Sequence, residues 1–112
     1  MTGDPDGSTE LTGVMSPSDV VQYQAGAVVS RTLVKKPCGT VTAFAFDAGE
    51  GLSEHTAPFD ALVLVVEGDA EISIAANPYH LKAGELLRLP AHRPHAVKAI
   101  TRLKMLLIMI KT

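Results

Sequence analysis

Two spaced motifs of glycine, proline and histidine, here called frames, decide the fold. They are Gly49-x5-His55, followed in the sequence by Gly68, and Gly84-x5-Pro90-x4-His95. Glycine tolerates the left-handed backbone of tight turns, so each frame combines turn positions with a histidine a few residues further on. Short β-type segments flank both frames. The pattern predicts a compact arrangement of short strands.

The residues around the frames fit an all-β domain. Valine, isoleucine, threonine and phenylalanine gather in short runs, and turn residues such as Asp47-Ala48-Gly49 and Asn77-Pro78 separate them. No helical period of useful length and no internal repeat is present. Strands at such steady spacing are typical of a sandwich or barrel. We expect strands over residues 27–33, 40–46, 62–66, 70–75, 79–81, 85–89, 95–100 and 104–110.

Both frames resemble the two motifs of the cupin superfamily over residues 26–112. The segments 52–61 and 90–96 are similar to those of small, stand-alone bacterial cupins, a subgroup largely without assigned reactions. The resemblance implies a double-stranded β-helix, that is, a jelly-roll barrel with a small site in its mouth. Carried over by position, His55 and His95 fall on two metal-ligand positions of the family.

The other polar positions of the family pattern are lost. A second histidine, a glutamate and often an asparagine are expected where this chain has Ala57, Ala61 and Ala99. Three methyl groups in place of longer side chains predict a larger, mostly apolar cavity, which is typical of a ligand site. We therefore expect these alanines to line a pocket for a small organic ligand.

The retained histidines predict a weak or incomplete site for a divalent metal. Catalytic zinc takes three protein ligands, and non-haem iron commonly takes two histidines and a carboxylate. His92, three residues before His95, is a candidate third imidazole, whereas Glu54 and Asp60 should point away by strand alternation. Zn, Ni, Mn or Fe would be held weakly there, if at all.

Three functions stay open at this stage. The first is binding of a small organic ligand in the barrel. The second is a metal-dependent oxygenase or isomerase that uses His55, His92 and His95. The third is a non-catalytic structural or regulatory module.

Composition narrows the class of protein. Of the 112 residues, 46% are hydrophobic and 20% charged, so the chain should fold as one domain. A net charge of −2 and few aromatic residues argue against a nucleic-acid partner. No apolar segment follows Met1 and none is long enough for a membrane span, so we expect a cytoplasmic protein. Residues 1–17 are expected to form a flexible tail and residues 18–112 the barrel domain.

Two expected strands are apolar on both faces. Leu62–Val66 and Met105–Ile110 lack the alternation of a strand that has one face in water. A second copy of the chain could cover the outer face, which predicts a two-fold homodimer. Alternatively, the N-terminal residues fold back as the cover.

Overall fold

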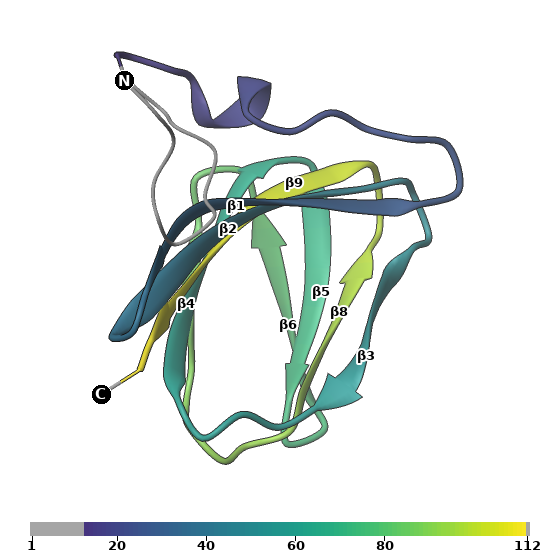
Figure 1. Ribbon diagram of the computed structural model, residues 1–112. Coiled ribbons are helices and arrows are strands. Elements are labelled where there is room, and N and C mark those ends of the chain that lie inside the picture. The colour runs from purple at the N-terminus through teal and green to yellow at the C-terminus, as the bar shows by residue number, and fades with distance from the viewer. Residues whose placement is uncertain (1–12, 112) are drawn as a thin grey trace.

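The computed structural model describes residues 13–111, which form two antiparallel sheets closed into a barrel (Figure 1). The larger sheet has the order β1-β2-β9-β4-β7 and the smaller has the order β3-β8-β5-β6. This confirms the expected all-β jelly-roll architecture. The strands are β1 (Val28–Lys36), β2 (Gly39–Phe46), β3 (Gly51–His55), β4 (Asp60–Glu67), β5 (Asp69–Ile74), β6 (Asn77–Lys82), β7 (Leu86–Leu89), β8 (His95–Ala99) and β9 (Leu103–Ile110).

The core lies between the two sheets and follows from strand alternation. In β5, Ala70, Ile72 and Ile74 are buried, while Glu71 and Ser73 point to the other side. The larger sheet contributes inward side chains in the same way, among them the fully buried Phe46 and Leu103. The interdigitated inner faces hold the barrel together and leave little free space inside.

The sequence did not predict β3. Only Leu52 in this segment is a good strand former, so local pattern carries no signal there. Pairing with β8 forms the strand, with Gly51 opposite Lys98. A Cβ atom at Gly51 would collide with the carbonyl oxygen of Val97, so this close approach requires glycine. The other expected strands agree with the observed ones within about three residues at their ends.

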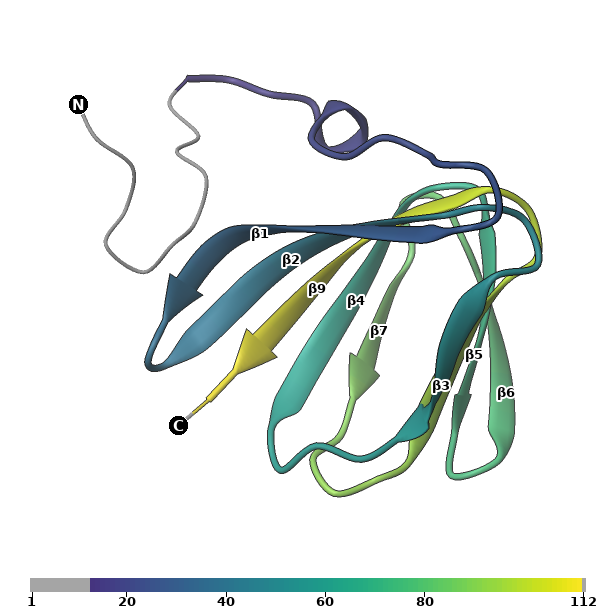
Figure 2. The ribbon, with the colours of Figure 1, turned by 45° about the vertical axis from the view of Figure 1, so that its right-hand side comes forward.

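A second, smaller core lies on the outer side of the larger sheet. A short 3-10 helix, η1 (Pro17–Asp19), leads into Val20 and Val21, which pack on Ala43 and Ala45 of β2. Figures 1 and 2 show this segment running across the end of the sheet. The N-terminal segment, residues 17–23, therefore provides part of the cover that the sequence left open.

Polar contacts fix the N-terminal segment to the barrel. The buried Lys104 amine donates to the backbone oxygen of Ser18, and it also lies 4.8 Å from the centre of the Tyr23 ring. The Tyr23 hydroxyl donates to the carboxylate of Glu67, and burial together with this carboxylate raises the pKa of Tyr23. Residues 13–16 are exposed, and the rest of the tail expected over residues 1–17 lies outside the described residues.

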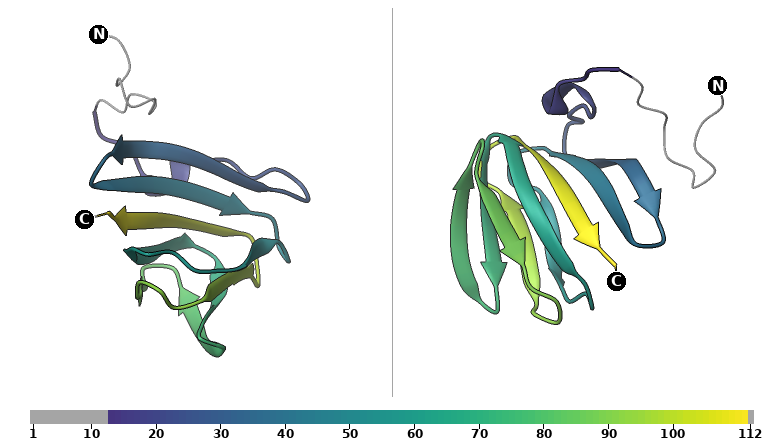
Figure 3. Two further views of the ribbon diagram at one scale, coloured as in Figure 1. Left: turned by 60° about the horizontal axis from the view of Figure 1, so that its bottom comes forward. Right: turned by 90° about the vertical axis from the view of Figure 1, so that its left-hand side faces the viewer.

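The larger sheet extends beyond the smaller one. It has five strands against four, and β1 stands at its edge. Figure 2 and the right-hand view of Figure 3 show β1 and β2 projecting from the barrel. Within residues 13–111, no helix is long and apolar enough to cross a membrane.

Candidate functional site

His55 and His95 meet in the barrel mouth. His55 ends β3, His95 begins β8, and the two residues are directly opposed in the ladder. Their Nε2 atoms are 3.1 Å apart, and the rings meet edge to face with centroids 4.3 Å apart. The structure thus brings together the two histidines that the sequence assigns to one site.

The hydrogen bonds of this histidine pair cannot all be satisfied by two neutral rings. His55 Nδ1 lies 2.9 Å from the Ser53 carbonyl oxygen, and His95 Nδ1 lies 3.3 Å from that of Arg93. A carbonyl oxygen only accepts, so each Nδ1 contact needs a hydrogen, and the Nε2 contact needs a third. Two neutral imidazoles carry only two hydrogens. One extra proton, a cation or a hydrogen-bond donor between the Nε2 atoms would complete the set.

Burial makes the extra proton costly. His95 is 8% exposed, and its pKa lies below the usual value because burial and the nearby His55 disfavour its charged form. The Arg93 carbonyl acts in the opposite direction. Near neutral pH His95 therefore favours its neutral form.

The pocket around the pair is apolar and small. Its volume is about 20 Å³, which is room for one water-sized group. The walls come from both sheets. Besides the two histidines they consist of Leu52, Val63, Leu89, Val97, Met105 and Leu107. These residues carry no motif in the sequence, although the alternation of β4, β8 and β9 points several of them inward.

The three alanines do not line this pocket. Ala61 and Ala99 are buried, at 4% and 0% exposure, and Ala57 is half-buried in the loop after β3. Neighbouring core side chains fill the space that shorter residues were expected to open, as expected for close-packed interiors. Neither of the two hollows described is lined by Ala57, Ala61 or Ala99, so the ligand cavity predicted from them stays a prediction.

His92 lies at the same mouth but is exposed and belongs to no three-ligand group. Its backbone is left-handed, at φ 65°, and its N–H donates to the carbonyl of Ala57 at 2.8 Å. Among residues 13–111 there is no group of three or more histidine, cysteine, aspartate or glutamate side chains placed to hold a metal. The structure thus offers two imidazoles where the three-histidine hypothesis needs His92 as well.

The other polar candidates have structural contacts. An oxygen of Asp60 accepts the backbone N–H of Ala91 at 2.8 Å, which ties the two mouth loops together. Glu54 is exposed. His80 points outward as expected, with its Nε2 atom 3.2 Å from Asp69 Oδ1.

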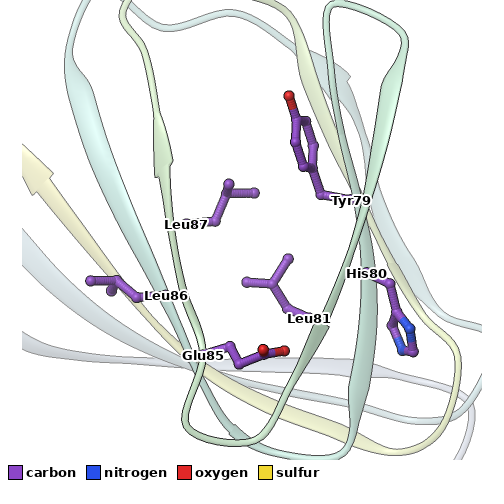
Figure 4. Close-up of a pocket in the computed structure, with 6 residues that line it drawn as sticks. All are labelled: Tyr79, His80, Leu81, Glu85, Leu86 and Leu87. Carbon is purple, nitrogen blue, oxygen red and sulfur yellow. The ribbon is translucent and has the colours of Figure 1, made fainter.

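A second hollow lies away from the histidine pair, between the edge strands β6 and β7 (Figure 4). Its volume is about 200 Å³. Tyr79, Leu81 and Leu87 point into it, whereas His80 points away. Glu85, on the same rim, is engaged by the backbone N–H of Lys82 at 2.7 Å. This hollow lacks convergent polar groups, so the histidine pair remains the candidate site.

The fold and the paired histidines define a small barrel protein with its site in the mouth. A family described as Cupin domain matches residues 43–111, and the chain belongs to this family. None of the curated proteins matches the chain.

Solved structures agree with this assignment. A conserved protein of unknown function from Streptococcus pyogenes is 31% identical with a TM-score of 0.89, over 100% of this chain and 96% of that one. A Cupin 2 conserved barrel domain protein from Leptotrichia buccalis is 44% identical with a TM-score of 0.81, over 84% of this chain and 46% of that one. A cupin superfamily protein from Desulfitobacterium hafniense is 26% identical with a TM-score of 0.87, over 92% and 94%.

Proposed function

We propose that this cupin binds a small organic ligand at the barrel mouth, with His55 and His95 as its polar anchor. The observation that carries the proposal is the Nε2 pair at 3.1 Å, whose three contacts require one hydrogen or cation more than two neutral rings supply. A ligand amine would donate one hydrogen to each Nε2 atom, and a ligand hydroxyl would donate to one of them. His95 lies on the buried, apolar side of the pocket, whereas the exposed His55 faces the entrance.

The small pocket limits how the ligand enters. Its volume of about 20 Å³ admits one functional group rather than a whole molecule. We therefore place a single polar group of the ligand at the Nε2 atoms and the remainder across the mouth. Leu52, on β3, and Leu107, on β9, face the pocket from opposite sheets and would contact that remainder.

The Nε2 atoms of the same pair fit two neighbouring coordination positions of a divalent metal, and the pair supplies no third ligand. Zinc–nitrogen distances of about 2.0–2.1 Å with bond angles of roughly 90–110° put two nitrogens about 2.8–3.4 Å apart, and the observed separation is 3.1 Å. Both Nδ1 atoms face backbone carbonyls, as is usual for ligating histidines. A metal bound here would supply positive charge to a ligand oxygen. The absent carboxylate makes this a weak site for Zn, Ni, Mn or Fe.

Cobalt titration tests the pair directly. We expect the visible spectrum of Co²⁺ to change on binding to the purified protein, with a dissociation constant in the micromolar range or weaker. His55→Ala and His95→Ala should each abolish the change. His80→Ala, which removes an exposed imidazole outside the pocket, is the matched control.

Three outcomes have distinct meanings. Binding lost in both site variants and kept in the control supports the anchor. Binding that also depends on His92 would favour the three-histidine enzyme hypothesis. Unchanged binding in His55→Ala and His95→Ala would refute the proposal and favour a structural module.

We also propose that the outer face of the larger sheet pairs with a second copy of the chain. The N-terminal segment covers the part around Ala43 and Ala45, while the remaining outward apolar side chains stay partly or fully exposed. Leu86 and Ile110 are 59% and 48% exposed. A two-fold dimer uses the same patch on both copies, so one apolar face can cover its counterpart. The outward apolar residues of β4, β7 and β9 are Leu62, Leu64, Val66, Leu86, Leu106, Ile108 and Ile110.

Light scattering at micromolar concentration tests this pairing. We expect a dimer mass for the native chain and a monomer mass for Leu64→Lys, in the middle of the face. Val14→Lys changes an exposed residue outside it and should leave the dimer intact. A monomer mass for the native chain would overturn the dimer.

A further inference from the structure

The inner face of the larger sheet changes character from apolar to hydroxyl-bearing. Where the smaller sheet lies opposite, Leu107 and Val63 are neighbours across β9 and β4 and point into the barrel. Continuing the same row outward, Leu107 pairs with Thr42 on β2, and Thr42 pairs with Thr32 on β1. The next row toward the mouth runs from Met109 to Thr40 and then to Lys35.

Alternation shows that these hydroxyls face inward. Phe44 and Phe46 on β2 belong to the main core, and Thr40 and Thr42 share their face. The outward residues of the same strand, Ala43 and Ala45, pack beneath the N-terminal segment. The strand is therefore apolar outside and hydroxyl-bearing inside at this end, the reverse of an ordinary barrel strand.

These hydroxyls are half-buried and lack partners. Thr32, Thr40 and Thr42, the hydroxyl face, have intermediate exposure. None of their side chains makes a hydrogen bond with another of the residues 13–111. Threonine is common in strands, so its presence alone says little. Three inward, partly desolvated hydroxyls on adjoining strands are a more specific observation, because buried polar groups usually have partners.

The hydroxyl face adjoins the histidine pocket. Leu107 lines that pocket, and neighbouring strands lie about 4.8 Å apart. Thr42 is thus one strand from a pocket wall and Thr32 two strands away. In the larger sheet β2 lies beside β9, which carries Leu107, and β1 lies beside β2 at the edge. A molecule of about six carbons anchored at the pair would reach the hydroxyl face.

We infer that the hydroxyl face binds the hydroxyl groups of the ligand and that Lys35 binds a carboxylate, so the ligand class is a small polyhydroxylated acid. This rests on the proposed function, since the histidine pair holds the other end. The two inner rows supply hydroxyls at Thr32, Thr40 and Thr42 and one cation at Lys35, with no acidic side chain among them. Hydroxyl-to-hydroxyl contacts suit a polyol, and the ammonium suits an anionic end.

A matched pair of probes tests the ligand class. Gluconate and 6-hydroxyhexanoate are both six-carbon monoanions with a terminal hydroxyl for the histidine pair, and only gluconate carries further hydroxyls along its chain. We expect gluconate to shift the amide resonances of β1, β2 and β3 in ¹H–¹⁵N spectra and to bind at least tenfold more tightly than 6-hydroxyhexanoate. A double variant, Thr32→Val with Thr42→Val, keeps the shape of both side chains and removes both hydroxyls. It should lower gluconate affinity about tenfold, which corresponds to the loss of roughly one hydrogen bond. Ser73→Ala, on the outward face of β5, should change nothing.

The variants separate this inference from the proposed function. Equal affinity for gluconate and 6-hydroxyhexanoate, both lost in His95→Ala, would overturn the hydroxyl face and leave the anchor standing. Gluconate binding that survives His95→Ala but not the double valine variant would overturn the anchor instead. The dispersion of the amide resonances checks that each variant is folded. Lys35→Met changes an exposed side chain and should lower the binding affinity of both acids. Failure of gluconate to shift any mouth resonance would refute the inference.

Discussion

Shortening Val20 and Val21 to alanine tests whether the N-terminal segment is part of the folded unit. Each valine is 5% exposed and packs in the small outer core with Ala43 and Ala45. Each substitution removes two carbon groups from a buried environment, at about 0.8 kcal/mol per group. The double variant should therefore lose about 3 kcal/mol of unfolding free energy. For a domain of this size that corresponds to roughly 12 °C in Tm.

Chemical and thermal denaturation followed by circular dichroism provide the assay. Val14→Ala is the control, because Val14 is fully exposed and should shift stability by less than about 0.5 kcal/mol. If the double variant is as stable as the control, the N-terminal segment does not pack on the sheet in solution. The outer face would then need another cover.

Two further predictions concern turns. The backbone amides of Gly26 and Ala48 and the Arg102 side chain hydrogen-bond the Asp47 carboxylate. The Gly26 amide contributes most to holding the pKa of Asp47 below its usual value, followed by Arg102 and the Ala48 amide. The stability that the Asp47 carboxylate contributes is therefore present above about pH 4 and is lost as the pH falls further and the carboxylate is protonated. In urea unfolding, Asp47→Asn should be less stable than the native chain at pH 7, and the difference should shrink towards pH 2. Gly68→Ala should cost at least about 2 kcal/mol, because at φ 87° its Cβ would collide with the Arg102 carbonyl. Gly84→Ala, at φ 88° with open space around it, should cost about 1 kcal/mol, and equal losses would contradict this account.

Much of the fold follows from local pattern, and the exceptions have physical causes. Alternation and turn residues predict strands such as β5, where Ile72 and Ile74 are buried and Glu71 is not. They cannot predict β3, which exists because Gly51 lets its backbone approach β8. The cover of the outer sheet face depends on contacts between residues far apart in the chain, so the sequence left two alternatives open.

The candidate site was predictable in its members but not in its shape. Spacing places His55 and His95 together, and the structure agrees. The volume of the pocket depends on how neighbouring side chains pack, so the sequence could not predict that the buried Ala61 and Ala99 lie outside the pocket of the histidine pair. The cluster of inward hydroxyls could not be predicted, because Thr32 and Thr42 come together only through the pairing of β1, β2 and β9.

The most direct test of the histidine anchor is to record the imidazole ¹⁵N resonances of the protein during titration with Zn²⁺. The chain has four histidines. We expect two of them, assigned to His55 and His95 by substitution, to carry their hydrogen on Nδ1. Their Nε2 resonances should shift as zinc is added. The resonances of the remaining two should stay in place. Zinc-induced shifts at His80 or His92 alone, or no shift at any histidine, would contradict the anchor.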